Sequence, residues 1–400
     1  MKGPLDGIRV IDLTSMISGP IATMLLADQG ADVIKVEPPA GDLVRVMGAG
    51  KHGVSATFLS ANRNKRSVVL DLKTARGVDL LKQLVATADV FVQNFRPGAV
   101  ARMGLSESAL RAIKPDLIYV SISGFGETGP YSHKRVYDPV IQALSGLAAI
   151  QADRDTGRPR MVRTIVPDKL TAITASQAIT AALFARERGS GGQHVKLSML
   201  DTMVAFLWPE GLAQLTFPGG ENSKPRGQLA QDLVFETADG YMTAGAVSDA
   251  EWQGMCEAFN KPEWLHDQRF NSAHKRVVNA AQRLEATQAV LRTQTTDYWL
   301  TLLDEKEVPC APIVGRENLL QHPQVIENAI VETLLHPIVG EVRQPRPAAQ
   351  FSDTPAAIQS HAPELGQHSD ELMLELGLDS AEIATLHQQG IVHGASHSAD

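Results

Sequence analysis

Short runs of β-branched and other apolar residues alternate with helix-like segments along residues 8–123. The apolar runs are IRVIDL, ADVIKVE, SVVLDL, ADVFVQN and LIYVSIS. Segments such as PIATMLLADQG and ARGVDLLKQLVATA separate them. Because strands that alternate with helices are typical of βαβ units, the pattern predicts an α/β fold with a mostly parallel sheet.

Polar, turn-forming residues follow several of these predicted strands. Thr14 and Ser15 come after the first run, Asn94 ends the fourth, and residues 123–126 close the fifth. Ligands of open α/β sheets bind beyond the carboxyl ends of the strands. We therefore expect the binding site at this edge of the sheet.

The sequence pattern changes after residue 205, where proline and glycine accumulate in PEGLAQLTFPGGENSKPRGQ, as in a linker between domains. Asp239-Gly240 lies between two alternating runs and predicts a β-hairpin. Helix signals reappear at residues 368–376, after a proline-rich stretch. The expected domains are a large α/β domain beginning with 1–205, a linker at 206–228, a smaller α+β domain at 229–325, and a linker and return to the large domain at 326–400.

Composition and charge narrow the class of protein. The 400 residues are 44% hydrophobic and 20% charged, with a formal net charge of −8, which is ordinary for a globular protein and argues against nucleic acid as a partner. The uncharged stretch 170–185 is too short to span a bilayer, and the early strand leaves no room for a signal peptide. Cys256 and Cys310 show neither metal-ligand nor disulfide spacing. We expect a cytoplasmic protein with neutral thiols, no metal and no membrane contact.

One glycine pattern suggests a different function. Residues 48–53, GAGKHG, fit G-x-G-x-x-G, and Asp71 follows at a spacing that dinucleotide-binding folds use. The preceding run LVRVM is short, however, and the following stretch lacks the small apolar face of a Rossmann helix. Dinucleotide binding is therefore an alternative only. Residues 189–192 are expected to form the turn before the strand HVKLSM.

Asp168 stands directly before a long uncharged segment, in PDKLTAITASQAITAALFA. The field at a helix N-terminus favours an ionised carboxylate, which would keep this residue available as a nucleophile. A simple N-cap is the alternative, because aspartate is among the preferred capping residues.

Sequence blocks spread over nearly the whole chain resemble the class III CoA-transferases, which include formyl-CoA and carnitine CoA-transferases. The blocks are PLDGIRVIDLTSMISGP, LADQGADVIKVEPPAGD, SANRNKRSVVLDLKTARG, ADVFVQNFRPGAVARMGL, and LIYVSISGFGETGPY running into VYDPVIQALSG. The resemblance implies a Rossmann-like large domain built from N- and C-terminal parts, a smaller domain, and an interlocked homodimer. It also implies an acyl-CoA and a small carboxylic acid as substrates, with coenzyme A thioester as substrate rather than a permanently bound cofactor.

In that family an aspartate at the place of Asp168 attacks the acyl-CoA thioester. The resemblance thus implies CoA transfer to a free acid through an aspartyl-acyl anhydride and an aspartyl-CoA thioester. Further residues are expected around CoA and the substrate: Ser15, Met16, Ile17, Leu72, Lys73, Asn94, Phe95, Arg102, Met103, Arg135 and Tyr137. Pro38 departs from relatives that hold the nucleotide with an arginine there. The glycine-rich loop that some relatives place over the aspartate has no clear counterpart, PGG at 218–220 being a poor substitute.

Three alternatives stay open. The first is racemisation, because the α-methylacyl-CoA racemases share the fold. They carry a histidine near the position of Tyr137, since removing and returning a proton needs a base on each face of the substrate. Tyr137 in place of that histidine favours CoA transfer. Tyr137 is otherwise a half-buried ring with a locally bonded hydroxyl. A non-catalytic CoA-binding protein is the third alternative.

Arg163 and Arg226 are able to hold a second carboxylate of the substrate acid, so we expect dicarboxylates such as succinate.

Overall fold

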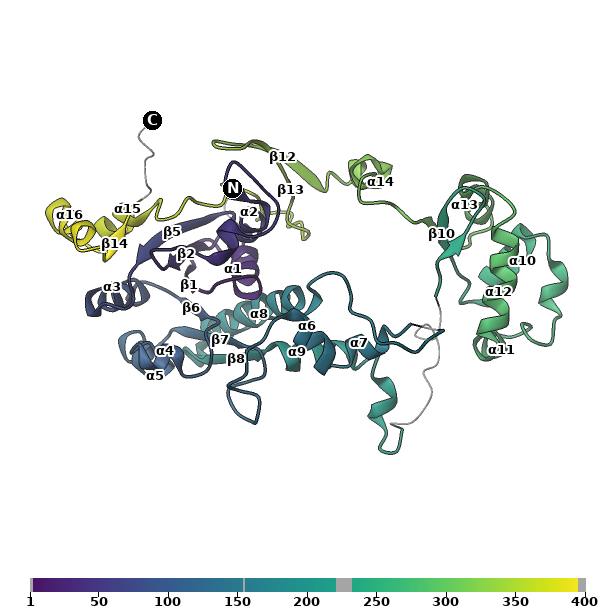
Figure 1. Ribbon diagram of the computed structural model, residues 1–400, viewed down its shortest axis with the longest axis horizontal. Helices are drawn as coiled ribbons and strands as arrows, with labels where there is room; N and C mark the ends of the chain where they lie inside the picture. The colour runs from purple at the N-terminus through teal and green to yellow at the C-terminus, as the bar shows by residue number, and fades with distance from the viewer. Residues whose placement is uncertain (1–2, 154, 221–231, 395–400) are drawn as a thin grey trace. The chain divides into compact units, whose positions relative to one another are not determined.

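The computed structural model describes residues 3–153, 155–220 and 232–394. The chain divides into two compact units, a first unit of Met1–Glu210 with Ala329–Asp400 and a second unit of Gly211–Asn328. Figure 1 colours the chain by residue number. The first unit therefore has two colour ranges, purple to teal for its N-terminal segment and yellow-green to yellow for its C-terminal segment, and the second unit is green. Each unit contains a hydrophobic core of its own.

A seven-stranded sheet runs through the described part of the first unit, in the order β14-β5-β2-β1-β6-β7-β8. Its strands are β1 (Arg9–Leu13), β2 (Asp32–Glu37), β5 (Lys65–Leu70), β6 (Val90–Gln93), β7 (Ile118–Ser123), β8 (His194–Ser198) and β14 (Val392–His393). All neighbouring pairs are parallel except β14 with β5. The predicted α/β fold with a mostly parallel sheet is confirmed.

Helices cover both faces of this sheet, because successive residues of a strand point to opposite faces. Val10 of β1 packs toward α1 (Ser18–Asp28) and α8 (Val166–Ala185). Its neighbour Ile11 lies in the opposite core, with side chains from α3 (Ala75–Ala86), α5 (Glu107–Ile113), α15 (Ser369–Glu375) and α16 (Ser380–Gln388). Strands buried on both faces explain the near-continuous apolar runs in the sequence.

Shorter elements complete the first unit. They are β3 (Gly50–Lys51), β4 (Val54–Ser55), α2 (Ala56–Asn62), α4 (Ala99–Arg102), α6 (Asp138–Leu144), α7 (Leu147–Ile150), α9 (Met199–Leu207), β12 (Val331–His336) and β13 (Gly340–Pro345). The helix predicted at residues 368–376 is confirmed as α15. The strand predicted from HVKLSM is confirmed as β8, and the turn before it uses positive φ angles of 93° at Gly189 and 71° at Gly191.

The glycine pattern at residues 48–53 does not form a nucleotide-binding turn. Its last residues join β3 and β4, which pair as an antiparallel hairpin, and the residues before it form a single 3₁₀ turn at Leu43–Val46. A dinucleotide fingerprint requires a glycine turn between a strand and a helix. The dinucleotide alternative is therefore wrong.

The second unit combines three antiparallel strands with helices. In its described residues the strands are β9 (Phe235–Glu236), β10 (Tyr241–Ala244) and β11 (Cys310–Pro312), and the α-helices are α10 (Asp249–Ala258), α11 (Ala273–Val278), α12 (Ala280–Leu291), α13 (Thr296–Asp304) and α14 (Pro323–Glu327). The hairpin predicted at Asp239-Gly240 is confirmed, since β9 pairs with β10 around it. Burial raises the pKa of Cys256 to about 12, which keeps that thiol neutral. Among the described helices, none has the length and apolarity needed to cross a membrane.

Candidate active site

The carboxyl ends of β1, β6 and β7 surround a cavity of about 180 Å³ in the first unit. The chain after each strand contributes to the wall, with residues 15–18, 94–97 and 123–125 respectively. Tyr137 and Asp168 complete the wall from the starts of α6 and α8. Asp168 is the one carboxylate in this wall among the residues that the structure describes.

Asp168 does not cap a helix. Helix α8 begins at Val166, its N-cap is Ile165, and no side chain caps it, so Asp168 lies in the first turn and the capping alternative is wrong. Its carboxylate instead accepts hydrogen bonds from the hydroxyl and the main-chain N–H of Ser18. Since Ser18 is the first residue of α1, the carboxylate lies at the N-terminus of that second helix.

The environment of Asp168 raises its pKa to about 6. Burial is the largest cause and the negative charge of Asp138 is the next, while the hydrogen bonds from Ser18 act in the opposite direction. The field at a helix N-terminus favours the ionised form and would lower the pKa. The pKa of Asp168 is raised instead, because burial and the like charge of Asp138 outweigh that field. A carboxylate with this pKa is still mostly ionised at neutral pH and is more basic than an ordinary aspartate.

Asp138 is the neighbouring acid that influences Asp168. It is buried at the start of α6, and its Oδ1 accepts a 2.6 Å hydrogen bond from Nε2 of Gln142. The Gln142 Oε1 in turn accepts from the main-chain N–H of Val162, 2.9 Å away, in the segment that leads to α8. Burial raises the pKa of Asp138 as well. These contacts tie the start of α6 to the segment that leads to α8, and the two carboxyl groups lie near enough for their charges to interact.

The loop from Ser15 to Ile17 has a strained conformation. Met16 has φ 68°, which non-glycine residues rarely adopt. The side chain of Asn94 makes two hydrogen bonds to the main chain of Ser15, the residue before Met16. Its Oδ1 accepts from Ser15 N–H (3.0 Å), and its Nδ2 donates to Ser15 O (2.8 Å). Asp42 Oδ1 accepts from the Met16 N–H at 3.2 Å. Asn94 thus has a positioning role, with both ends of its amide already engaged.

Buried ion pairs lie beneath this loop. Lys35 donates to Asp42 (2.9 Å) and to the carbonyl oxygen of Thr14 (3.0 Å). Lys65 donates to Asp12 (2.9 Å), which also accepts from the Thr14 main chain at 3.0 Å. The side chains of Lys35, Lys65 and Asp12 are inaccessible to solvent. Charges buried in this way are held in one geometry, and they fix the end of β1 from which the loop departs.

A second cavity, of about 820 Å³, adjoins the first. The two cavities share Ser15, Met16 and Phe95 in their walls. Pro38 lines the larger cavity, and the exposed Lys73 lies in the same wall. Lys73 is therefore a cation of this cavity that is able to meet a phosphate.

The expected site residues fall into three groups. Ser15, Met16, Ile17, Asn94, Phe95 and Tyr137 line the small cavity together with Asp168. Leu72, Lys73 and Met103 line the large one. Arg102, Arg135 and Arg163 are exposed and line neither cavity in the described structure, and Arg226 lies outside the described residues.

Tyr137 is 66% exposed and lines the small cavity. Within the described residues no hydrogen bond joins its hydroxyl to another group. The alternative of a half-buried ring with a locally bonded hydroxyl is therefore wrong, and the hydroxyl is available to a ligand.

Four residues of this region were missed from the sequence. Ser18 and Asp138 act on Asp168 directly, and the exposed cations Arg96 and Lys134 line the small cavity. Asp138 had a usable signal, because an acidic residue followed by proline is typical of a helix start. Lys134 and Arg135 are adjacent, and only the folded loop shows which of them reaches the wall. No group of three or more His, Cys, Asp or Glu in the described ranges is placed to hold a metal ion.

Comparison with known proteins agrees with this geometry. The sequence model of CoA-transferase family III matches residues 5–369. Succinyl-CoA:glutarate CoA-transferase of Mus musculus is 36% identical and covers 97% of this chain and 90% of its own, and formyl-CoA:oxalate CoA-transferase of Shigella sonnei is 31% identical over 97% and 99%. A CaiB/BaiF family protein from Brucella suis has a crystal structure that matches with a TM-score of 0.81 at 30% identity, over 94% of this chain and all of the other. The chain therefore belongs to CoA-transferase family III and is an enzyme of that class.

Proposed function

We propose that this enzyme moves CoA from an acyl-CoA donor to a free dicarboxylic acid, with Asp168 as the nucleophile. The observation that carries the proposal is the position of Asp168, the carboxylate in the wall of a small cavity at the carboxyl edge of the sheet. Its raised pKa of about 6 suits the role, because it leaves the group ionised at neutral pH and increases its basicity.

Asp168 is the only protein group that forms a covalent bond in the proposed transfer. Its carboxylate attacks the thioester carbonyl, and the thiolate of CoA leaves from an aspartyl-acyl anhydride. The thiolate then attacks the aspartyl carbonyl, forming an aspartyl-CoA thioester and releasing the donor acid. The acceptor carboxylate attacks that thioester, which expels the thiolate and forms a second aspartyl-acyl anhydride. The thiolate then attacks the acyl carbonyl of the acceptor in this anhydride, which releases the new acyl-CoA and the free carboxylate of Asp168.

Oxyanions that form in these steps need hydrogen-bond donors. The N-terminus of α1 has no side-chain cap, and its Ser18 already donates to Asp168. Main-chain N–H groups at a helix N-terminus are suited to developing negative charge. We assign oxyanion stabilisation to this end of α1, which the strained loop from Ser15 to Ile17 presents to the cavity.

The two adjoining cavities supply a path for CoA. With the thioester beside Asp168, the pantetheine arm crosses the shared wall of Ser15, Met16 and Phe95. The nucleotide then occupies the cavity of about 820 Å³, a volume within the range typical of ligand sites. Lys73 meets a phosphate there, in place of the arginine that Pro38 replaces.

Two lines of support favour dicarboxylic acids. The relatives are named for glutarate, succinyl and oxalate groups. In this chain Arg96 and Lys134 lie in the wall of the cavity that holds Asp168. One carboxylate of the acid reacts at Asp168, and these cations attract the other through charge-assisted hydrogen bonds.

The test is to incubate the enzyme with succinyl-CoA and glutarate in heavy water, and to measure the mass of the peptide that contains Asp168. We expect a covalent CoA adduct on that peptide and formation of glutaryl-CoA. Asp168→Asn should lose the adduct and at least about 1000-fold in kcat, as is typical when a nucleophile is removed. Deuterium at the substrate α-carbon without an adduct would instead establish racemase-type proton chemistry.

Asp201→Asn is the matched control, because Asp201 is also an aspartate in the first turn of a helix, α9, but is exposed and lines neither cavity. It should retain the adduct and the full rate. Equal loss in both variants would contradict a specific role for Asp168. Equal turnover of monocarboxylic and dicarboxylic acceptors would contradict the proposed substrate class.

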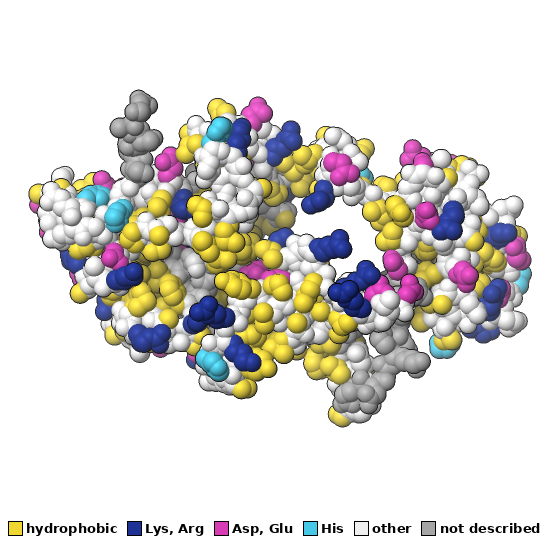
Figure 2. Space-filling model, viewed as in Figure 1, with side chains coloured by type: hydrophobic (Ala, Val, Ile, Leu, Met, Phe, Trp, Pro, Cys, Tyr) yellow, Lys and Arg dark blue, Asp and Glu magenta, His cyan; other side chains and the backbone are white. Residues whose placement is uncertain are grey.

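A homodimer is part of the proposal. Helix α8 packs against α1, α6 and α9, yet large hydrophobic side chains of this group stay exposed: Val140, Leu144, Ile173, Phe184 and Phe206. Figure 2 shows hydrophobic side chains on the surface in the region where Figure 1 labels α6 and α9. Exposed apolar surface of this kind is typical of a protein interface, which supports the interlocked dimer that the family resemblance implies.

A further inference from the structure

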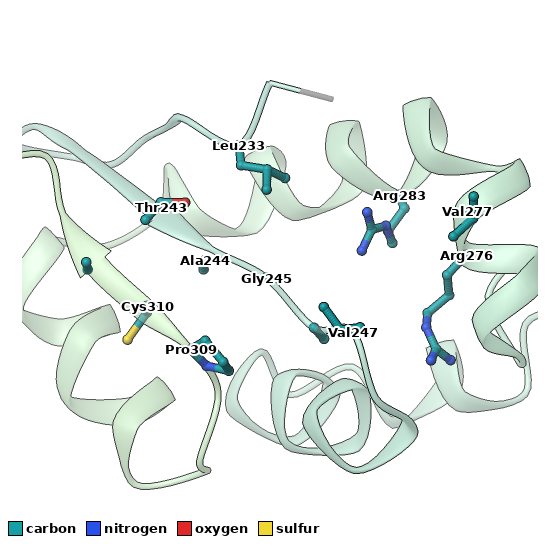
Figure 3. A pocket seen from close by; sticks show the side chains of 12 residues that line it. Leu233, Thr243, Ala244, Gly245, Val247, Arg276, Val277, Arg283, Pro309 and Cys310 are labelled. Atoms are coloured by element: carbon teal, nitrogen blue, oxygen red, sulfur yellow. The ribbon is translucent and has the colours of Figure 1, made fainter. Parts of the chain in front are cut away.

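The cations in two cavities of this enzyme differ in the groups that hold them. Figure 3 shows a cavity in the second unit, where Arg276 donates to Asp249 Oδ1 at 2.6 Å. In the small cavity of the first unit, Arg96 and Lys134 line the wall. Within the described residues, neither of these two forms an ion pair with an acidic side chain. Arg96 and Lys134 are therefore available to a carboxylate of the substrate.

An aromatic ring holds Lys134 at this wall. The Nζ atom of Lys134 lies 3.3 Å from the ring centre of Tyr131. The Tyr131 ring in turn packs edge-to-face against Phe125, with 5.6 Å between the ring centres and an angle of 84° between the ring planes. Phe125 and Lys134 line the small cavity, but Tyr131 does not. Tyr131 therefore contacts the cation from outside the cavity wall.

A turn before α6 decides which cation reaches the cavity. The main-chain N–H of Lys134 donates to the carbonyl oxygen of Tyr131 at 2.9 Å, which closes a β-turn with these two residues at its ends. Their side chains are in contact, whereas the next residue, Arg135, is exposed and lines neither cavity of the first unit. The turn and the ring together place Lys134, and not Arg135, in the wall.

The contact with the ring prepares Lys134 for a ligand. The electron-rich face of an aromatic ring attracts a cation. A lysine side chain that rotates freely loses conformational entropy when a ligand fixes it, and the contact with Tyr131 reduces that loss. The ring occupies one side of the ammonium group, which has three N–H donors. The donors that point away from the ring stay available to a carboxylate.

We propose that Tyr131 is a positioning residue that determines the preference of this enzyme for dicarboxylic acids. It acts through Lys134, by fixing a positive charge at the wall of the cavity that contains Asp168. The second carboxylate of the acceptor acid binds to this charge. The role rests on the proposed function, because it requires that the acceptor reacts at Asp168. Its effect is on binding of the acid and not on the covalent steps.

The test compares two acceptors of CoA from succinyl-CoA, glutarate and valerate, which has the same carbon chain with a single carboxylate. Tyr131 is 39% exposed, so its variants are expected to fold. Tyr131→Leu should raise KM for glutarate by about two- to fivefold, as expected for an exposed cation–π contact, with kcat nearly unchanged. The ratio of kcat/KM for glutarate to that for valerate should fall by the same factor. Tyr131→Phe keeps the ring and should keep the ratio.

Lys134→Met tests whether Tyr131 acts through the cation. It should lower the glutarate-to-valerate ratio by about tenfold, because a charge-assisted hydrogen bond is lost. Adding Tyr131→Leu should lower the ratio no further, since the ring then has no cation to hold. Tyr298→Leu is the matched control, because Tyr298 is an exposed tyrosine that packs edge-to-face against Trp299 and lines neither cavity of the first unit. It should leave the ratio as it is in the natural enzyme.

The covalent CoA adduct on Asp168 separates this role from the proposed function. Both would fail if the natural enzyme formed neither the adduct nor glutaryl-CoA. If the adduct and the transfer are intact, an unchanged ratio in Tyr131→Leu would overturn the role of Tyr131 alone. So would a further fall of the ratio in the double variant. A fall in Tyr131→Leu that is absent in Tyr131→Phe would support it.

Discussion

Asp168 shows how neighbours, rather than residue type, determine the chemistry of a side chain. Its two helix N-termini and the hydrogen bonds from Ser18 would lower its pKa, yet burial and Asp138 raise it to about 6. Burial weakens the stabilisation that water gives to the charged form, and a like charge adds to this effect. The result is a carboxylate that is both ionised at neutral pH and unusually basic, which suits the nucleophilic role that we propose for it.

This balance predicts the pH dependence of the enzyme. An acid whose pKa is raised loses its charge as pH falls through the raised value, so kcat/KM should fall below about pH 6. Asp138→Asn removes the neighbouring charge and keeps an oxygen that can accept from Gln142. It should lower the pKa of Asp168 and move this acidic limb to lower pH by roughly one unit.

The measurement is the pH profile of kcat/KM for both proteins between acid and neutral pH. Glu285→Gln, which removes an exposed carboxylate of the second unit, should leave the limb in place. An acidic limb that stays near pH 6 in Asp138→Asn would contradict the assigned cause.

The end of β1 and the loop after it are the elements that organise the site. Asp12 and Lys65 form an ion pair with no solvent exposure beneath the loop. Burial would raise the pKa of Asp12, but the charges of Lys65 and Lys35 and a hydrogen bond from Thr14 lower it to about 2. Burial lowers the pKa of Lys65 to about 8 in spite of Asp12. The pair therefore stays charged at neutral pH, and each member depends on the other.

Removing one member of the Asp12–Lys65 ion pair should destabilise the fold around the end of β1. Lys65→Met leaves Asp12 buried without its 2.9 Å partner and should lower the free energy of unfolding by about 3–5 kcal/mol. Lys114→Met breaks a pair with Asp116 that is partly exposed and should change it by less than about 1 kcal/mol. Urea unfolding followed by circular dichroism measures both. Similar values for the two variants would show that the buried pair does not hold the loop.

At the scale of the whole molecule, the exposed apolar side chains of α6, α8 and α9 predict association. A stable dimer interface buries well over 1,000 Å² in total and is more apolar than the remaining surface. Phe184, Phe206 and Ile173 supply such surface on one side of the first unit. Their exposure would be costly in an isolated subunit.

We therefore expect a homodimer in sedimentation analysis. If its subunits are interlocked, tagged and untagged native dimers should not exchange subunits on mixing, because exchange would require unfolding, whereas joint refolding should produce mixed dimers. Phe206→Asp together with Ile173→Asp should reduce dimer formation, while Ile326→Asp on the second unit should not. A monomer, or fast exchange between native dimers, would contradict the interlocked assembly.

The sequence by itself determined the α/β fold class and the edge of the sheet at which the candidate site lies. Periodicity predicted the parallel strands of the sheet within one or two residues of their observed ends, as with IRVIDL and β1, but not the short edge strand β14. Buried parallel strands require apolar runs, and helices require their own repeat. The family resemblance indicated Asp168 and nine other residues that line the two cavities.

Only the tertiary structure decided the electrostatics of the site. Ser18 and Asp138 lie far from Asp168 in sequence and act on it through packing of α1 and α6 against α8. Arg102, Arg135 and Arg163 had suitable chemistry but are exposed outside the cavities, while Arg96 and Lys134 line the wall. The sequence shows which residues carry a charge. Their burial, their orientation and the distances between them depend on the folded chain, and these properties decide the pKa of each group and which ligand atoms it can contact.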